Sequence, residues 1–158
     1  MGSDKGLDSL QVWQRSMAFA KRVLLEVVPH LPVEEKWAMA NQIRRAVQSI
    51  PANIAEGYGR FYYQEGVRFC YIARGSLEEV YSFLVLANEL GYLQKEQFQD
   101  LVDEIRELHR MLNGYISFLK RSKRGENEPG SDLLVKELPG EYEIDQASDF
   151  PDSQATDT

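Results

Sequence analysis

The two histidines, His30 and His109, are the first side chains to consider for metal chemistry. A di-metal helical bundle uses two Glu-x-x-His pairs and two further Glu residues on facing helices. Neither histidine of this chain follows a Glu three residues earlier. The acidic pairs at 34–35 and 78–79 are followed one turn later by uncharged residues, so they do not form the facing carboxylates that hold a metal and a phosphate. We therefore expect no metal site.

Cys70 is the only cysteine, which excludes an intramolecular disulfide and favours a reducing, cytoplasmic location. No histidine lies one helical turn from Cys70, so we interpret it as a small buried hydrophobe rather than a nucleophile. Gly57-Tyr58-Gly59 is too short for a phosphate-binding loop and is interpreted as a helix connector. The sequence thus predicts a protein that is not an enzyme and needs no cofactor.

The charges are divided unevenly along the chain. Residues 1–124 hold 17 basic and 15 acidic residues, whereas residues 125–158 hold one base and ten acids. The sequence pI of about 4.9 therefore reflects the C-terminal segment. Nucleic-acid binding has to be judged from the charge of each part separately, and the first part, at +2, remains a candidate.

Two groups of basic residues could contact nucleic-acid phosphates. They are Arg45, Arg60 and Arg68 in the middle of the chain, and Lys120, Arg121, Lys123 and Arg124 at the end of the last predicted helix. Solvated charge is the alternative for both groups, and the second also complements a helix C-terminus. Arg44 could pair with Glu78. The acidic segment 125–158 could fold over the second group and compete with RNA.

A cluster of polar, glycine and aromatic residues ends the second predicted helix. Asn53 and Glu56 share one side of that helix, and we expect structural or interface roles for them and for Gly57, Tyr58 and Tyr62. A binding surface is the alternative for Asn53 and Glu56. The aromatic residues at 58 and 61–63 could stack on bases or anchor a contact between subunits, and we favour the contact.

Apolar residues recur in steps of three and four over four long segments, which predicts helices near 8–30, 33–57, 62–90 and 95–123. The first predicted stripe includes Leu10, Trp13, Met17 and Leu24, and the second includes Trp37. Short connections make neighbours antiparallel, so residues 8–124 are predicted to form an all-α, up-down-up-down four-helix bundle. The acidic segment 125–158 is predicted to be disordered. No membrane span or secretory leader is visible.

The segment Ser49-Ile-Pro-Ala-Asn-Ile-Ala-Glu-Gly57, followed by Arg60, resembles the signature of a small bacterial four-helix-bundle family. Its members include proteins encoded within intervening sequences of 23S ribosomal RNA genes. Matching pieces at 10–13, 42–45, 72–78 and 90–93 extend the resemblance over about residues 8–120.

This resemblance implies a bundle that assembles into a ring-like homopentamer associated with ribosomal RNA. A related group serves diversity-generating retroelements, which implies RNA or a reverse-transcriptase-like protein as partner. The alternative function is a protein-interaction scaffold, or an accessory subunit of a co-encoded enzyme, that binds no nucleic acid.

Overall fold

The computed structural model describes residues 6–127, and this part of the chain is helical with no β-strand. Its long helices are α1 (Gln11–Arg22), α2 (Met39–Tyr58), α3 (Tyr63–Glu89) and α4 (Lys95–Ser122). Short helical turns flank α1: η1 (Leu7–Ser9), η2 (Val23–Val27), η3 (Val28–His30) and η4 (Val33–Glu35). The predicted all-helical class is confirmed, whereas the predicted disorder of the acidic segment falls almost entirely on residues 128–158, outside the described residues.

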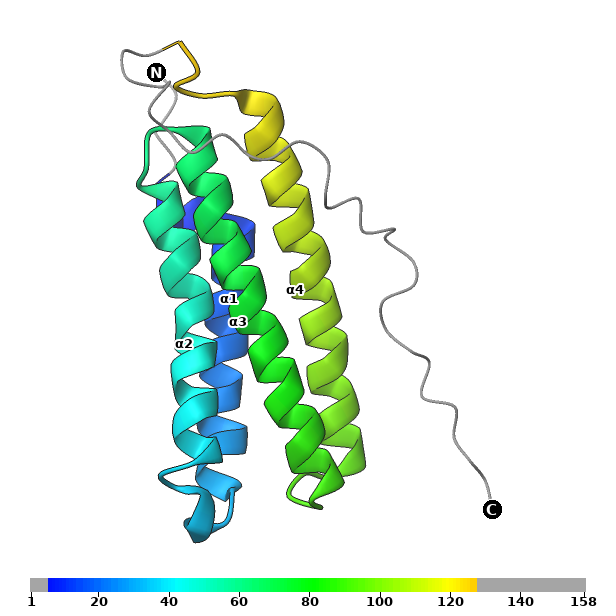
Figure 1. The fold of residues 1–158 in the computed structure, drawn as a ribbon. Coiled ribbons are helices and arrows are strands. Elements are labelled where there is room, and N and C mark those ends of the chain that lie inside the picture. Colours follow the sequence, from blue (N-terminus) through cyan, green and yellow to red (C-terminus); the bar gives the residue numbers. More distant parts are fainter. Residues whose placement is uncertain (1–5, 128–158) are drawn as a thin grey trace.

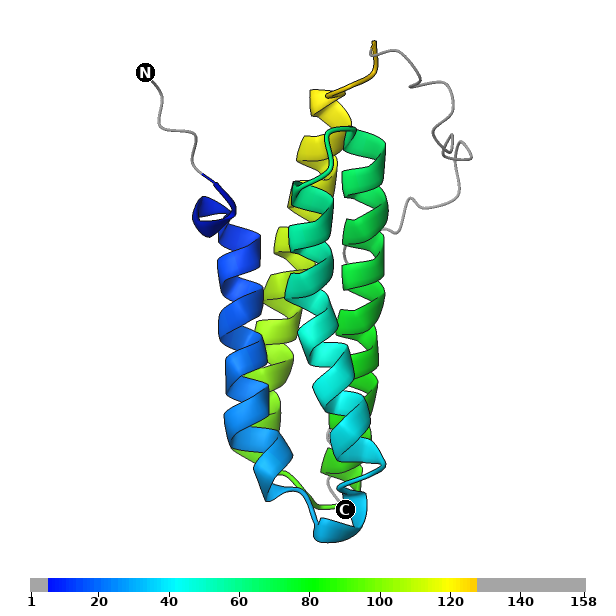
Figure 2. The same ribbon diagram turned by 90° about the vertical axis from the view of Figure 1, so that its left-hand side faces the viewer.

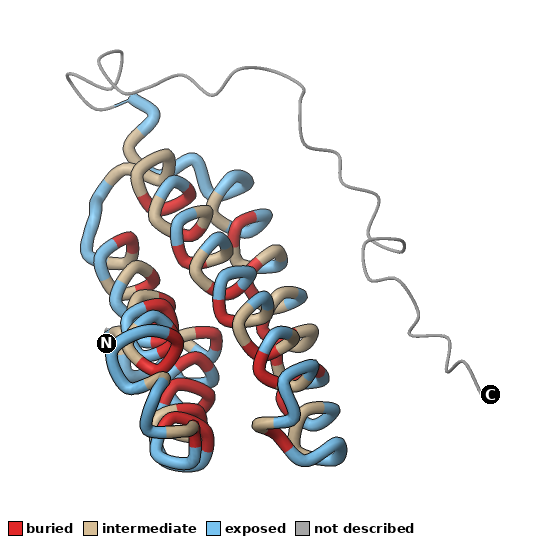
Figure 3. The backbone as a smooth tube through the Cα atoms, turned by 60° about the horizontal axis from the view of Figure 1, so that its bottom comes forward, coloured by how far each residue is buried: buried red, intermediate tan, exposed pale blue. Residues whose placement is uncertain are grey.

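Successive helices lie side by side and run in opposite directions along the molecule (Figures 1 and 2). The α2–α3 connection and the end of α4 lie at the upper end of Figure 1, and the other two connections lie at the lower end. Buried residues recur on the inward side of each helix (Figure 3). The largest fully buried side chains include Phe19, Ile43, Ile50, Ile54, Leu77, Leu84, Leu101, Ile105, Leu108 and Leu112. Within residues 6–127, no helix combines the length and apolar character needed to cross a membrane.

Helix α1 continues into a wider π-helical turn, η2, because of Pro29. Proline has no N–H, and its ring would clash with the carbonyl four residues earlier, at Leu25. In η2 the N–H of Val28 instead donates to the carbonyl of Val23, five residues back. The wider turn carries the chain to Pro29, which lies in the first turn of η3. The helical path thus reaches His30, as predicted, with two changes of winding.

The inward face of α1 differs from the predicted one by about one residue. Val12, Ser16, Phe19 and Val23 are buried, whereas Met17 is 46% exposed. Of the other members of the predicted stripe, Ala20, Val27 and Leu31 are buried as predicted, and Leu10, Trp13 and Leu24 are partly buried against the core. Both stripes have helical spacing, so periodicity alone could not distinguish the core face from its flank.

The predicted start of the second helix is wrong. Residues 33–35 form η4 and a turn follows, so α2 begins only at Met39. Trp37, predicted to lie in the core stripe, is 82% exposed. Its ring carries the Lys36 ammonium 5.0 Å from the ring centre. Glu34 and Glu35 therefore lie in the short η4 turn, and the Glu35 carboxylate accepts a hydrogen bond of 3.3 Å from the N–H of Met39 at the start of α2.

Helices α2 and α3 approach most closely at a pair of glycines near the upper end. A Cβ atom built on Gly57 would lie 3.0 Å from the carbonyl oxygen and 3.3 Å from the Cα of Gly66. Gly57 therefore lies inside α2 and permits close helix packing, and the expectation that it ends the helix is wrong. Gly59 follows as the cap, in right-handed rather than left-handed conformation. Gly91, at φ +77°, is the left-handed glycine that ends α3.

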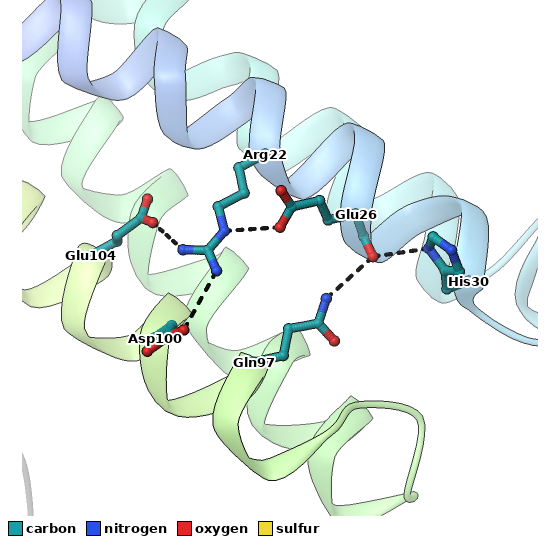
Figure 4. Close-up of polar contacts among 6 residues, drawn as sticks. All are labelled: Arg22, Glu26, His30, Gln97, Asp100 and Glu104. Carbon is teal, nitrogen blue, oxygen red and sulfur yellow. Dashed lines mark hydrogen bonds and ion pairs between the residues drawn. The ribbon is translucent and has the colours of Figure 1, made fainter.

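The lower half of α1 is joined to α4 by the guanidinium of Arg22 (Figure 4). Its Nε lies 3.0 Å from a Glu26 carboxylate oxygen, and its other nitrogens contact Glu104 and, at 3.8 Å, Asp100. Hydrogen bonds with Glu26 and then Glu104 raise the pKa of Arg22. The Gln97 amide also donates to the carbonyl of Glu26, at 3.2 Å. One cation therefore compensates three carboxylates at the edge of the α1–α4 contact.

Candidate nucleic-acid interface

A chain of polar contacts fixes α3 against α4 halfway along the bundle. Arg74 donates to the Asn113 side-chain oxygen at 3.0 Å. The Asn113 amide nitrogen lies 3.2 Å from Nδ1 of His109, and Nε2 of His109 lies 3.3 Å from Glu78. Because Arg74 can only donate, the Asn113 nitrogen must face His109, whose Nδ1 then accepts. Glu78 thus pairs with His109 on α4, and not with Arg44 as expected.

Above this chain of contacts, α3, α4 and the turn after α4 present five basic residues, of which Lys123 pairs with Glu126 at 3.4 Å. No Asp or Glu occurs in residues 66–77 of α3 or in 108–125 at the end of α4. We call the cations of this surface the basic band: Arg74, Lys120, Arg121, Lys123 and Arg124. It extends from the level of Asn113 to Arg124, about 17 Å at the rise of an α-helix. Four of its members were predicted, and the structure adds Arg74.

Aromatic rings hold the cations of the band in place. The guanidinium carbon of Arg74 lies 4.9 Å, and the Lys120 ammonium 5.5 Å, from the centre of the half-buried Tyr71 ring. Arg124 lies 4.8 Å from the centre of the Phe61 ring. Such cation–π contacts restrict the long side chains while their charge stays at the surface. The band is therefore a partly ordered set of positive charges.

The end of α4 is attached to the α2–α3 connection. Lys123 adopts a left-handed conformation at φ 47°, and the carbonyl of Arg124 accepts a hydrogen bond of 3.0 Å from the N–H of Tyr63. Gly125, at φ +84°, lies against the Tyr62 ring, because a Cβ atom there would be 2.5 Å from Tyr62 Cδ1. The turn after α4 thus reaches its position only with a glycine next to the ring.

This attachment gives the aromatic cluster a role within the chain that was not predicted. Tyr62 packs edge-on against Phe61, with ring centres 5.5 Å apart. Tyr63 packs on a small second core formed by Val67, Cys70 and Ile116. Burial raises the pKa of the Tyr115 phenol to about 12, with smaller contributions from the neighbouring Cys70 and the half-buried Tyr58. Stacking on bases and contact between subunits both stay predictions for these residues.

Two arginines of the first predicted group, Arg60 and Arg45, lie apart from the band. Arg60 lies 5.3 Å from the centre of the Phe69 ring and pairs with Glu56 at 3.1 Å and with Glu65 at 3.9 Å. Its charge is therefore largely compensated. Arg45 is exposed on α2, and its position is about 22 Å along the helix from Arg60. Arg68 is exposed on α3. Arg45 and Arg60 are therefore too far apart to act as one phosphate site, and the role predicted for Arg68, in the acid-free stretch 66–77, stays a prediction.

Asn53 links α2 to α3 through a serine pair. Its amide nitrogen donates to the Ser49 carbonyl at 2.8 Å and contacts the Ser49 hydroxyl at 3.0 Å. That hydroxyl lies 2.7 Å from the hydroxyl of Ser76 on α3. The geometry favours the structural interpretation of Asn53. Glu56 serves through its ion pair with Arg60.

Two exposed glycines follow Arg74 and Asn113 directly in the sequence. Gly75 and Gly114 are exposed in the middle of α3 and α4, and a Cβ atom on either would meet nothing within 4 Å. Glycine within a helix costs roughly 1 kcal/mol relative to alanine, and packing inside the chain does not require it here. A surface without side chains at these positions allows a ligand backbone to approach closely.

The residues considered for metal or nucleophilic chemistry lie apart. His30 is exposed, and its Nδ1 lies 3.0 Å from the carbonyl of Glu26 near the lower end. His109 is in the α3–α4 contact described above. No group of three or more potential metal ligands occurs within residues 6–127. Cys70 is fully buried, and burial raises its pKa to about 12, which keeps the thiol protonated at neutral pH.

The fold and this surface define the class of protein: a small helical bundle with a basic face at one end. Residues 8–114 match the sequence model of the 23S rRNA-intervening sequence protein family, and the chain belongs to this family. A similar solved structure is a protein of unknown function from the S23 ribosomal protein family of Bacteroides thetaiotaomicron. It is 27% identical, covers 66% of this chain and 97% of that chain, and has a TM-score of 0.61. No curated protein matches the chain.

Proposed function

We propose that this chain is a non-enzymatic, RNA-associated member of the 23S rRNA-intervening sequence protein family, with the basic band as its RNA contact. The observation that carries the proposal is the absence of acidic residues from 66–77 and 108–125, the stretches of α3 and of α4 with its following turn that hold the five cations of the band. The near-neutral charge of residues 1–124 does not contradict it, because the charges are segregated.

The band favours recognition of the RNA backbone rather than of bases. The rings of Tyr71 and Phe61 already have cations close to their centres, so they are poorly placed to stack on bases as single-strand-binding proteins do. Point charges over about 17 Å suit the phosphates of a structured RNA. Ribosomal RNA and retroelement RNA both offer such phosphates.

Fluorescence anisotropy with a labelled RNA duplex tests the proposal. Four or five phosphate contacts predict that affinity falls roughly 100- to 500-fold between 50 and 200 mM salt. The triple variant R74Q/K120Q/R121Q is expected to weaken binding and to flatten this salt dependence. The matched control is K21Q/R44Q/K95Q, which removes the same charge from exposed residues outside the band. Equal binding by the two variants, or no binding by the unmodified chain, would contradict the proposal.

We further propose that the protein is a homo-oligomer, with a pentamer as the form implied by the family resemblance. The supporting surface is the flank of α1, where Met17 is 46% exposed beside the partly buried Trp13 and Leu24. An apolar row at the edge of the core is suited to cover by a second copy. Light scattering of the unmodified chain and of Met17→Glu tests this: the variant should have the lower mass, and a monomeric mass for the unmodified chain would refute it.

The alternative, a scaffold for a partner protein such as a reverse transcriptase, has one observation in its favour. Val33 is 77% and Trp37 is 82% exposed. Both belong to the connection that leads into α2, which lies at the lower end of Figure 1, opposite the end of α4. Exposed tryptophan is common among residues that dominate protein interfaces. Loss of a co-purifying protein on Trp37→Ala, with RNA binding unchanged, would favour this alternative.

A further inference from the structure

The segment that follows the described bundle has the composition of a polyanion. Residues 128–158 contain nine acidic residues and one lysine in 31 positions. The turn at 123–126 ties the end of α4 to the α2–α3 connection through the hydrogen bond from Tyr63 to Arg124. The polyanion therefore starts within a few residues of Arg124, at the upper end of the basic band.

We propose that residues 128–158 lie on the basic band of their own chain and compete there with RNA phosphates. The competition with RNA rests on the proposed function, whereas the contact within the chain does not. The charges are complementary, at −8 for the segment against five cations in the band. Carboxylates and phosphates are both satisfied by Arg and Lys donors, so the two ligands exclude each other from the same groups.

The length of the segment suits this contact. A chain of 31 residues spans roughly 30 Å as a flexible coil, which exceeds the length of the band. An attached segment of this kind is present at an effective concentration of about 1 mM. If its dissociation constant as a separate peptide were about 0.1 mM, the ratio of molecules with the segment on the band to molecules with a free band would be about ten. RNA affinity would then be about tenfold lower than with a free band.

The rest of the described surface is less suitable for a polyanion. The lower end mixes its cations with acids: Lys36 adjoins Glu35, and Lys95 adjoins Glu96. Arg22 is already paired with three carboxylates, and Arg60 with two. In the band, by comparison, Lys123 pairs with Glu126 at 3.4 Å, and the stretches 66–77 and 108–125 hold no acidic residue.

Paramagnetic relaxation enhancement tests the contact without RNA. The variant Ser153→Cys provides a labelling site, and Cys70 can remain because it is fully buried. A nitroxide at position 153 is expected to broaden the amide signals of the upper halves of α3 and α4 at 50 mM salt and to leave them sharp at 500 mM. The proposal would be overturned if no signals broaden, if the broadened signals lie at the lower end of the bundle, or if the broadening persists at 500 mM salt.

Two control chains separate charge from sequence. Replacing the nine acids of 128–158 by Asn and Gln should abolish the broadening, whereas scrambling the segment with its charges retained should preserve it. Preserved broadening in the neutral chain would overturn the electrostatic explanation. So would loss of broadening in the scrambled chain. A mixture of isotope-labelled chain and unlabelled nitroxide-bearing chain should show no broadening, and broadening there would mean that the segment reaches another copy.

RNA binding supplies the second readout. The neutral-segment variant is expected to bind the RNA duplex about tenfold more tightly than the unmodified chain at 50 mM salt. Unchanged affinity, where both chains bind, would overturn the competition. If neither chain binds RNA while the broadening is observed, the proposed function fails and the contact within the chain stands.

Discussion

The close packing of α2 on α3 makes Gly57→Ala the sharpest test of the fold. The added methyl group would lie 2.9 Å from Phe69 Cβ, 3.0 Å from the Gly66 carbonyl oxygen and 3.3 Å from Gly66 Cα. None of these atoms is the movable end of a side chain, so the two helices must separate. Overpacking of this kind costs about 1–3 kcal/mol, against which alanine returns up to about 1 kcal/mol of helix propensity.

We therefore expect Gly57→Ala to lower the free energy of unfolding by about 1–2 kcal/mol, or the melting temperature by roughly 3–8 °C. Urea unfolding followed by circular dichroism at 222 nm measures the change. The matched controls are Gly75→Ala and Gly114→Ala, where a Cβ atom meets nothing within 4 Å. These should raise stability by about 0.5–1 kcal/mol each. If Gly57→Ala is as stable as the unmodified chain while the controls behave as expected, the helices do not meet at this pair of glycines.

Three further changes test other contacts. Asn53→Ala should lower the free energy of unfolding in urea by about 1 kcal/mol, because it removes the hydrogen bonds that orient the Ser49–Ser76 pair. The control Gln48→Ala, at an exposed neighbouring position, should be nearly neutral. Equal effects of the two substitutions would count against a role of Asn53 in joining α2 to α3. Arg22→Gln should lower the free energy of unfolding by about 1 kcal/mol or less at low salt, and by less still in 1 M NaCl, because salt screens partly exposed ion pairs. A decrease in stability that is the same at both salt concentrations would point to packing instead. The pKa of Cys70 is raised from 9.0 to about 12 on folding, so its contribution to stability is fully present below pH 9 and decreases as pH rises toward 12. Between pH 7 and pH 10.5, the free energy of unfolding should therefore fall more for the unmodified chain than for Cys70→Ala. Equal decreases for the two chains would contradict the burial of the thiol.

The helices themselves could be predicted well from the sequence. The periodicity of α4 predicted residues 95–123, and the helix spans Lys95–Ser122. The apolar pattern of α3 and Gly91 located that helix to within a residue at each end. These elements have one apolar face and clear end signals, so local sequence and tertiary packing agree.

The wrong predictions for the core face of α1, for Trp37 and for Gly57 arose because local spacing does not specify which helices pack together. In α1 two adjacent stripes are both apolar, and only the position of α2 and α4 decides that Phe19 is inward and Met17 is not. At Trp37 the residue lies in a turn whose spacing continues the apolar pattern of α2 by coincidence. Gly57 looked like a helix end because its partner, Gly66, is nine residues away and belongs to another helix.

The basic band could be predicted only in part. Lys120, Arg121, Lys123 and Arg124 are adjacent in sequence, so their cluster was visible. Arg74 joins them through the register of α3 on α4, which the Asn113 hydrogen bond and the shared Tyr71 ring establish. The missing acids in two separate stretches, 66–77 and 108–125, were a usable signal once α3 and α4 were expected to be neighbours.

The described part of the chain starts and finishes at the same pole of the molecule, since η1 and the turn after α4 both lie at the upper end in Figures 1 and 2. The segments that precede residue 6 and follow residue 127 therefore both leave the bundle at the pole that carries the α2–α3 connection. A probe intended to leave that pole untouched belongs in the 31–38 connection at the opposite end.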